Sequence, residues 1–189
     1  MSTAAEELAR WRQQVLSELR GTVLDLGAGH GPAARHLRPD VRWLALEPFP
    51  SRRLARTVAA RPGSQLLAAS ASQIPLPDAS VDAVVCSMVL CSVPDPAETL
   101  AEVRRVVRPA GRVVFFEHVA AAPTSLAHRA QRLITPLTKV LWRGCDSCRD
   151  SEAAIRQAGF AQVRLRSLPP SRWIGWLVPL ILICGDAVR

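Results

Sequence analysis

The sequence predicts an α/β protein built on a mostly parallel, doubly wound sheet. Segments typical of buried strands alternate with helical segments along the chain, and this alternation gives parallel strands joined by right-handed crossovers. The first strand-like segment also runs directly into a glycine-rich turn over 27–31, as expected where the first strand of such a sheet meets a helix. The 189 residues contain no internal repeat and no long linker, so we expect a single domain over 1–189.

The first half of the chain alternates helix and strand up to residue 69. Apolar residues recur at roughly helical spacing before Gly21, which ends an N-terminal helix within residues 1–20. Glu47-Pro48 closes the second strand, and Ser51 is a suitable N-cap for the helix that follows. The expected elements are a helix over 4–19, a strand over 22–26, a helix over about 31–37, a strand over 41–46, a helix over 51–60 and a strand over 65–69.

The second half continues the alternation after a proline-containing loop over 70–80. A continuous apolar run over 81–86, broken only by Asp82, is typical of a strand buried on both faces. Pro96 suits the first turn of a helix, and a tight turn is expected over 108–111. The expected elements are a strand over 81–86, a helix over 96–107, a strand over 112–117, a helix over 125–142 broken near Pro136, a helix over 151–158, and strands over 160–168 and 177–187.

Charge and hydropathy limit the partners. The net charge of +8 comes from scattered arginines without a Lys/Arg block, so we expect a solvated surface and no specific nucleic-acid partner. Charges throughout the first 20 residues exclude a secretory signal. The longest apolar stretch, 173–184, is interrupted by Gly175 and Pro179 and is shorter than the about 18 residues of a membrane span. We therefore expect no transmembrane segment, and we interpret this stretch as a buried strand with its approach.

The cysteines indicate a cytoplasmic location. Their number, 5, is odd and their spacing forms no disulfide framework, which is typical of a reducing compartment. Cys145 and Cys148 form a lone C-x-x-C pair, whereas a zinc site needs about four ligands. We therefore expect no metal, and the role of the pair stays open.

The spacing of the glycine turn separates three ligand classes. A P-loop needs Gly-Lys-Ser/Thr at the helix start, where this chain has Gly31-Pro32-Ala33. A nicotinamide or flavin site needs G-x-G-x-x-G, where this chain has G-x-G-x-G. The remaining candidate is S-adenosylmethionine, which has no phosphate and whose amino-acid and ribose parts can lie against a glycine loop.

Acidic residues end the first two strands. Asp25 ends the first, where a carboxylate can orient the loop or meet the ammonium group of the ligand. Glu47 ends the second, about twenty residues further on, where a carboxylate can accept hydrogen bonds from both ribose hydroxyls. The alternative for Glu47 is a solvated turn acid before Pro48.

Four blocks of sequence carry a family resemblance. The blocks are 23–31, 45–48, 75–82 and 102–111. Together they resemble the class I S-adenosylmethionine-dependent methyltransferases. The resemblance implies a Rossmann-like sheet of seven strands with the last strand antiparallel and inserted beside the sixth. It also implies that S-adenosylmethionine is the cofactor and S-adenosylhomocysteine the product.

The loop, the strand ends and this resemblance define the expected cofactor-binding set. The end of the fourth strand would line the methionine moiety, and the backbone of Ala71 with a hydroxyl of Ser70 or Ser72 would contact the adenine. The set is Asp25, Gly27, Ala28, Gly29, His30, Gly31, Glu47, Pro48, Ser70, Ala71, Ser72, Cys86, Ser87 and Met88.

A narrower resemblance concerns the acceptor. Residues 84–93, 116–121 and 142–145 are similar to the small thiol methyltransferases found in microsomal membranes. That family has an N-terminal membrane anchor, for which we expect no counterpart here, and Ala110 stands in place of its usual glycine. The resemblance implies methyl transfer to a small molecule, with a thiol as the first hypothesis. The alternatives are an O- or C-methyltransferase of secondary metabolism and a non-catalytic module that binds S-adenosylmethionine.

Candidate catalytic residues follow the fourth and fifth strands. A thiol with a pKa of about 8.5 is partly ionised and needs little base catalysis. His118 is the candidate base or substrate contact, its alternative being a hydrogen-bonded structural histidine, and its neighbour Glu117 can orient a helix or ligand. Cys91 either faces the acceptor or is an inert buried cysteine. By analogy with the fold, 122–150 is expected to form an acceptor lid, and the oligomeric state stays open.

Overall fold

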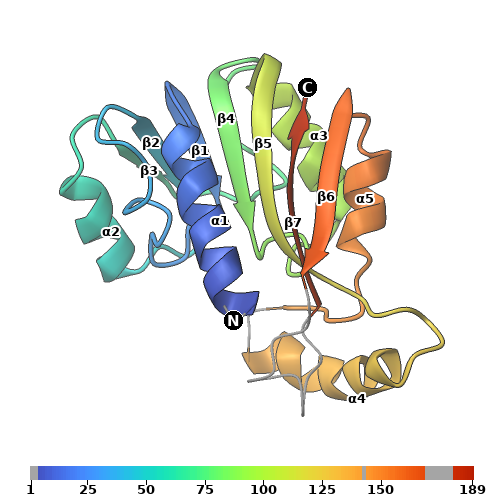
Figure 1. Cartoon of the computed structure of the whole chain (residues 1–189). Helices are drawn as coiled ribbons and strands as arrows, with labels where there is room; N and C mark the ends of the chain where they lie inside the picture. The colour runs from blue at the N-terminus through green and yellow to red at the C-terminus, as the bar shows by residue number, and fades with distance from the viewer. Residues whose placement is uncertain (1–3, 142–143, 169–180) are drawn as a thin grey trace.

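A computed structural model of the protein describes residues 4–141, 144–168 and 181–189. Strands and helices alternate as the sequence predicts, and Figure 1 shows one sheet with helices on both sides. The elements are α1 (Ala4–Glu18), β1 (Thr22–Leu26), β2 (Arg42–Leu46), α2 (Arg52–Ala59), β3 (Gln65–Leu67), β4 (Val81–Ser87), α3 (Pro96–Val106), β5 (Val107–Val119), α4 (Leu126–Leu141), α5 (Ser151–Gln157), β6 (Gln162–Leu168) and β7 (Ile181–Val188).

The sheet has seven strands in the order β3-β2-β1-β4-β5-β7-β6. The strands from β1 to β5 pair in parallel, whereas β7 lies antiparallel to both β5 and β6. This topology confirms the expected sheet, with its last strand inserted beside the sixth. Because β1, β2, β4 and β5 are parallel, their carboxyl ends meet at one edge, which is the lower edge in Figure 1.

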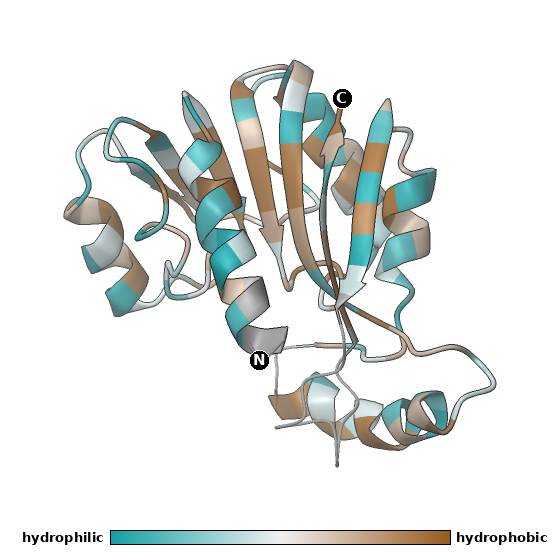
Figure 2. Ribbon diagram, in the orientation of Figure 1, coloured by the Kyte–Doolittle hydropathy of each residue, from teal (hydrophilic) through white to brown (hydrophobic). Residues whose placement is uncertain are grey.

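Each face of the sheet carries its own hydrophobic core. On one face, Leu24 of β1 packs in a cluster with Val103 of α3 and Ile155 of α5. On the other, Val23 packs in a cluster with Leu16 of α1 and Leu54 of α2. Neighbouring residues of one strand thus serve opposite cores, because side chains alternate along a strand. Figure 2 shows central strands that are largely hydrophobic, beneath an α1 whose outer side is largely hydrophilic.

The helix expected over 31–37 does not form. The segment consists of consecutive turns, in which the backbone N–H of Leu37 donates to the carbonyl of Ala33 at 3.3 Å. Pro32 and Pro39 leave space for little more than one turn, because a residue before proline is disfavoured in a helix.

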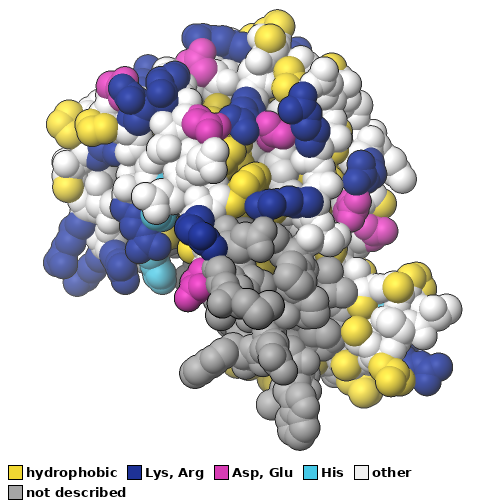
Figure 3. Space-filling model, in the orientation of Figure 1, with side chains coloured by type: hydrophobic (Ala, Val, Ile, Leu, Met, Phe, Trp, Pro, Cys, Tyr) yellow, Lys and Arg dark blue, Asp and Glu magenta, His cyan; other side chains and the backbone are white. Residues whose placement is uncertain are grey.

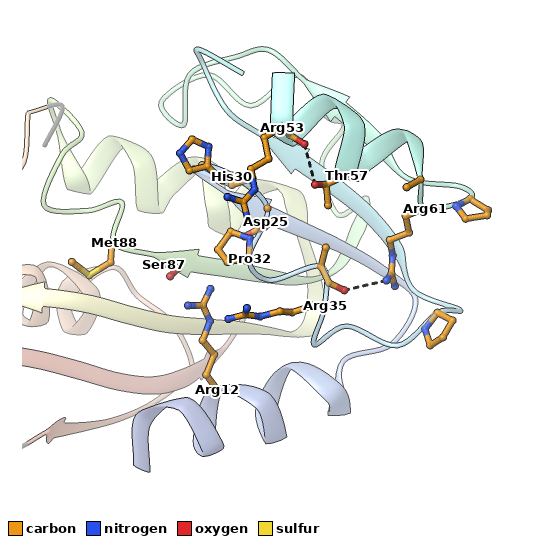
Figure 4. A pocket seen from close by; sticks show the side chains of 18 residues that line it. Arg12, Asp25, His30, Pro32, Arg35, Arg53, Thr57, Arg61, Ser87 and Met88 are labelled. Atoms are coloured by element: carbon orange, nitrogen blue, oxygen red, sulfur yellow. Dashed lines mark hydrogen bonds between the residues drawn. The ribbon is translucent and has the colours of Figure 1, made fainter. Parts of the chain in front are cut away.

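Arg61, in the loop after α2, supplies the hydrogen bonds that a helix would have provided. Its guanidinium donates to the backbone carbonyls of Ala34, Leu37, Arg38 and Val41. Buried carbonyl groups need partners, and this side chain satisfies several of them at once. The bond to Ala34 is drawn in Figure 4.

Two further features differ from the prediction, and a third lies partly outside the described residues. The tight turn expected over 108–111 is absorbed into β5 as an irregularity, where Ala110 has a φ of 62° and the register with β4 shifts. β3 ends at Leu67, before the expected 69. Of the strand expected over 177–187, residues 177–180 lie outside the described residues, as does 173–180 of the apolar stretch.

The helix expected to break near Pro136 is continuous, because α4 carries Pro136 inside it. A proline removes the hydrogen bond to the carbonyl four residues earlier. Pro136 and Arg132 are both exposed, so water can hydrate the Arg132 carbonyl that loses its partner.

No helix in the described ranges combines the length and apolar composition needed to cross a bilayer. On the face shown in Figure 3, the Lys and Arg side chains are spread over several elements rather than gathered in one block.

Candidate functional site

The glycine turn lies at the carboxyl edge of the sheet, between the ends of β1 and β2. The N–H of Ala28 donates to the carbonyl of Leu46 at 2.9 Å, which ties the turn to β2. Gly27 has a φ of +61°, and a Cβ there would lie 2.7 Å from Val89 Cγ2. Gly29 has a φ of +58°, but a Cβ there would meet nothing nearer than 3.9 Å. The backbone at Gly29 is therefore open to a ligand, whereas Gly27 is needed for packing.

Glu47 joins the turn to the end of β2. Its side chain is buried, and Oε2 accepts a hydrogen bond from the N–H of Gly29 at 3.0 Å. Oε1 accepts a longer bond of 3.4 Å from the N–H of Phe49. The fold thus brings the acid at the second strand end against the glycine turn, as the sequence predicts. A buried carboxylate bound to backbone N–H groups is unlike the solvated turn acid that was the alternative.

A cavity of about 1,030 Å³ opens beside the turn. It extends from the end of β4 past the glycine turn to α2, as Figure 4 shows. Of the expected cofactor-binding set, it is lined by Asp25, Gly27, Ala28, Gly29, His30, Gly31, Ser87 and Met88. Glu47, Pro48, Ser70, Ala71, Ser72 and Cys86 are not among its lining residues.

Asp25 lies beneath the turn. It is 2% exposed, and its Oδ2 accepts a hydrogen bond from Trp43 Nε1 at 3.2 Å. Burial raises the pKa of Asp25 to about 7, although the Trp43 bond and the Arg12 charge act in the opposite direction. The carboxyl group therefore titrates near neutral pH.

Arg12 is a site residue that sequence reasoning missed. It projects from α1 into the cavity, with the Arg35 side chain beside it in Figure 4. Its guanidinium lies 5.3 Å from the centroid of the Phe116 ring, and its Nε has no hydrogen-bond partner within the described part of the chain. Arg12 is one of several charged residues on an amphipathic helix, so the sequence offers no signal that separates it from the others.

The turn after β4 is held by a buried acid. Met88 has a φ of 58°, an uncommon conformation for a side chain of its size. Glu117 is fully buried, and its carboxyl oxygens accept bonds from the N–H groups of Val89 at 2.9 Å and Leu90 at 3.2 Å. Burial raises the pKa of Glu117 to about 8, against the effect of these donors. Glu117 therefore positions the turn rather than facing the cavity.

Contrary to expectation, Cys86 does not line the cavity. Its side chain is fully buried, and its Sγ lies 3.3 Å from Glu117 Oε1. The reason is the alternation of side chains in β4, which directs Cys86 to the opposite sheet face from Val85. Ser87 and Met88, beyond it, do line the cavity.

The residues expected to contact adenine lie in the loop after β3, where Ser70 is exposed and Ser72 is half-buried. The hydroxyl groups of Ser70 and Ser72 are 3.0 Å apart, and the Ala71 side chain is buried. Arg105 anchors the same loop by donating to the carbonyls of Ile74 and Leu76. His30, within the glycine turn, is exposed, with its Nδ1 3.1 Å from the Ser51 hydroxyl.

Of the two candidate catalytic residues, His118 belongs to β5 and Cys91 to the segment after β4, and neither lines the cavity. His118 is 1% exposed, and neither ring nitrogen has a hydrogen-bond partner within the described residues. Burial lowers the pKa of His118, with Asp146 acting in the opposite direction. Cys91 is also buried, and its Sγ lies 3.6 Å from Cys145 Sγ. That contact raises the pKa of the Cys91 thiol and lowers the pKa of the Cys145 thiol.

Comparison with known proteins identifies the family. A family model described as a methyltransferase domain matches residues 24–115. The thiol S-methyltransferase TMT1B of Homo sapiens is 32% identical over 192 residues, which cover 94% of this chain and 78% of the relative. TMT1A of Homo sapiens is 31% identical over 198 residues, covering 97% and 80%. The chain belongs to the class I S-adenosylmethionine-dependent methyltransferases.

Solved structures of methyltransferases share the fold. The geranyl diphosphate C-methyltransferase of Streptomyces coelicolor A3(2) superposes with a TM-score of 0.77 at 13% identity, covering 97% of this chain and 80% of that one. The 1,6-didemethyltoxoflavin-N1-methyltransferase of Burkholderia thailandensis superposes with a TM-score of 0.68 at 19% identity, covering 95% and 77%.

S-adenosylmethionine is the cofactor of this methyltransferase. The residues around the glycine turn fit this cofactor. Gly29 leaves open space above its backbone, and the Glu47 carboxylate lies beside that space. Neither feature requires a phosphate on the ligand, in agreement with the absence of a regular helix over 31–37.

Asp25 should make the stability of the methyltransferase depend on pH. An unfolded aspartate has a pKa of about 3.9, so between that value and about 7 the folded chain holds a proton that the unfolded chain releases. The free energy of unfolding should therefore fall as pH rises through this interval. Asp25→Asn removes this contribution, and its urea midpoint should depend less on pH between about 5 and 7. The pKa of Glu117 is about 8, so this residue should leave some pH dependence in the Asp25→Asn variant.

The matched control is Asp40→Asn, at an exposed acid whose pKa is lowered by its hydrogen bond to Arg38. Because the pKa of Asp40 is lowered, this group titrates below the interval. The urea midpoint of Asp40→Asn should therefore depend on pH as that of the wild type does. An equal slope in Asp25→Asn and wild type would mean that Asp25 is ionised throughout.

Proposed function

We propose that this methyltransferase acts on a small thiol. The observation that carries the proposal is the identity of 32% to a thiol S-methyltransferase over 94% of this chain. We keep the cytoplasmic location that the cysteine content predicts.

We infer that the ends of the parallel strands hold the cofactor. Bound S-adenosylmethionine supplies an electrophilic methyl group on a sulfonium. Glu47 has carboxyl oxygens suited to the ribose hydroxyls, and the open backbone at Gly29 admits the same part of the ligand. Ser70 or Ser72 offers a hydroxyl to the adenine, and Ser87 and Met88 border the methionine moiety.

Arg12 is proposed to bind the carboxylate of the methionine moiety. Arg12 and Arg35 place two cationic groups on one cavity wall. A sulfonium and an ammonium group are repelled by such a wall, so the carboxylate is the part of the cofactor that it can hold. The aromatic ring of Phe116 supports the Arg12 guanidinium through a cation–π contact.

We propose that His118 receives the acceptor proton. Its lowered pKa keeps the imidazole neutral at neutral pH, and a neutral imidazole can accept a proton. Cys91 keeps its own proton because its pKa is raised. Cys91 instead holds the segment 122–150 in place, because its backbone carbonyl accepts a hydrogen bond of 2.8 Å from the N–H of Asp146. The segment 122–150 would then border the acceptor as a lid.

The acceptor is tested with a matched set of compounds. Thiophenol, phenol and aniline share one ring and differ in the accepting atom, so labelled methyl transfer compares sulfur, oxygen and nitrogen directly. We expect methyl thioether formation from thiophenol to exceed transfer to the other two. Methylation of phenol but not of thiophenol would contradict the thiol assignment and favour an O-methyltransferase. Binding of S-adenosylhomocysteine without transfer to any acceptor would favour the non-catalytic alternative.

Arg12→Gln should weaken cofactor binding. Loss of a charge-assisted hydrogen bond costs about 1.5–3 kcal/mol, so KM for S-adenosylmethionine should rise by roughly 10- to 150-fold, with a smaller change in kcat. Arg12→Lys should recover part of the affinity because it keeps the charge. Arg10→Gln, at an exposed arginine on the same helix, is the control. An unchanged KM in a folded Arg12→Gln variant would show that Arg12 does not contact the cofactor.

A further inference from the structure

The helix α4 has its polar side inside and its apolar side outside. Gln131 and Thr138 are 0% and 3% exposed. The Gln131 side chain bonds to the backbone of Val119 and Ala121, and the Thr138 hydroxyl donates to the Cys145 carbonyl at 2.8 Å. In a water-exposed helix of a globular protein the apolar side normally faces the core. Hydrogen bonds therefore fix the polar side of α4 to the described part of the molecule, and its apolar side is exposed.

We name this exposed side the apolar face of α4. Its large side chains are exposed by between 52% and 84%, and Figure 3 shows hydrophobic side chains gathered there, over α4 at the lower right. Single exposed apolar residues are normal, but a continuous row on one helix marks an interaction surface. The face consists of Leu126, Leu133, Leu137, Val140 and Leu141.

Positive charge lies along one border of this face. α4 contains no acidic residue, whereas Arg129, Arg132 and Lys139 fall next to one another on a helical projection. Lys139 forms an ion pair with Asp146 at 2.9 Å. Arg129 and Arg132 are exposed, and neither has an ion-pair partner among the residues that the structure describes.

We propose that the apolar face of α4 docks on the surface of an anionic phospholipid bilayer. A helix with an apolar face bordered by arginines can bury that face at the boundary between headgroups and acyl chains, and the arginines gain from anionic headgroups. A second copy of the chain fits less well, because the same face of a partner would bring only further positive charge. Anionic lipid supplies both the apolar contact and the opposite charge.

Docking in this way would orient the methyltransferase. α4 lies beyond the carboxyl edge of the sheet, as Figure 1 shows. Its polar side contacts 144–148, and Asp146 there is bonded to Cys91. The bilayer would thus face the side on which we place the acceptor. An acceptor that partitions into lipid would reach this side without crossing the solvent.

The test measures co-sedimentation of the full chain with vesicles, without cofactor or acceptor, so that its failure leaves the proposed methyl transfer untouched. We expect the wild type to bind phosphatidylcholine vesicles containing phosphatidylserine more tightly than vesicles of phosphatidylcholine alone. Leu133→Gln/Val140→Gln should lower the partition coefficient about tenfold or more, because both side chains lose their apolar burial. The control is Phe49→Gln, at another exposed apolar residue that is 76% exposed, and it should bind as the wild type does.

The arginines are tested separately. Arg129→Gln/Arg132→Gln should remove most of the preference for phosphatidylserine, roughly fivefold for each arginine. Arg52→Gln/Arg56→Gln, at exposed arginines of α2, should leave the preference unchanged.

Two results would overturn the proposal. The first is vesicle binding that Leu133→Gln/Val140→Gln leaves unchanged, because the apolar face would then make no lipid contact. The second is the absence of vesicle binding by a wild type that sediments as a dimer, when the same double variant sediments as a monomer. The apolar face would then belong to an interface between copies of the chain.

Discussion

The hydrogen bond from the N–H of Gly29 to the Glu47 carboxylate, 3.0 Å long, is the contact on which the cofactor site depends. It fixes a turn with little regular structure against the end of β2, and it does so with the acid proposed to bind the ribose. A buried carboxylate needs donors close by, and the glycine turn provides one. The positive φ angles that free this N–H would strain most other residues. One contact therefore determines the shape of the loop, the placement of the acid and the open backbone at Gly29.

Polar side chains at three other places supply hydrogen bonds to backbone groups that lack partners in regular secondary structure. Arg61 binds carbonyl groups of the segment that fails to form a helix. Glu117 binds the N–H groups that follow Met88, so the unusual conformation at that residue persists. Arg105 holds the loop after β3 by its carbonyl groups. Arg61 itself lines the cavity, whereas Glu117 and Arg105 position segments of the site without lining the cavity.

The sequence predicts the sheet well because its signals are local. Apolar runs such as 81–86 mark strands, and Gly27 with Gly29 marks the loop that departs from the first of them. Prediction from the sequence fails where a residue distant in the chain determines the local conformation. The segment 31–37 has helix-forming alanines, but Pro32, Pro39 and a remote arginine determine its conformation. Cys86 illustrates the same limit, because only the pairing of the strands shows which face it occupies. Arg12 becomes part of the site only when α1 packs over Phe116, and nothing in its local sequence indicates this.

The central claim is that the glycine turn and Glu47 together bind the cofactor of this methyltransferase. Calorimetric titration with S-adenosylhomocysteine tests it most directly. The wild type should bind, and Glu47→Ala should bind more weakly by about 1–3 kcal/mol, the cost of losing hydrogen bonds to a charged group. Glu98→Ala, at an exposed acid of α3, should bind as the wild type does. Equal affinity of the wild type and a folded Glu47→Ala variant, or no heat and no rise in melting temperature with the wild type, would contradict the account.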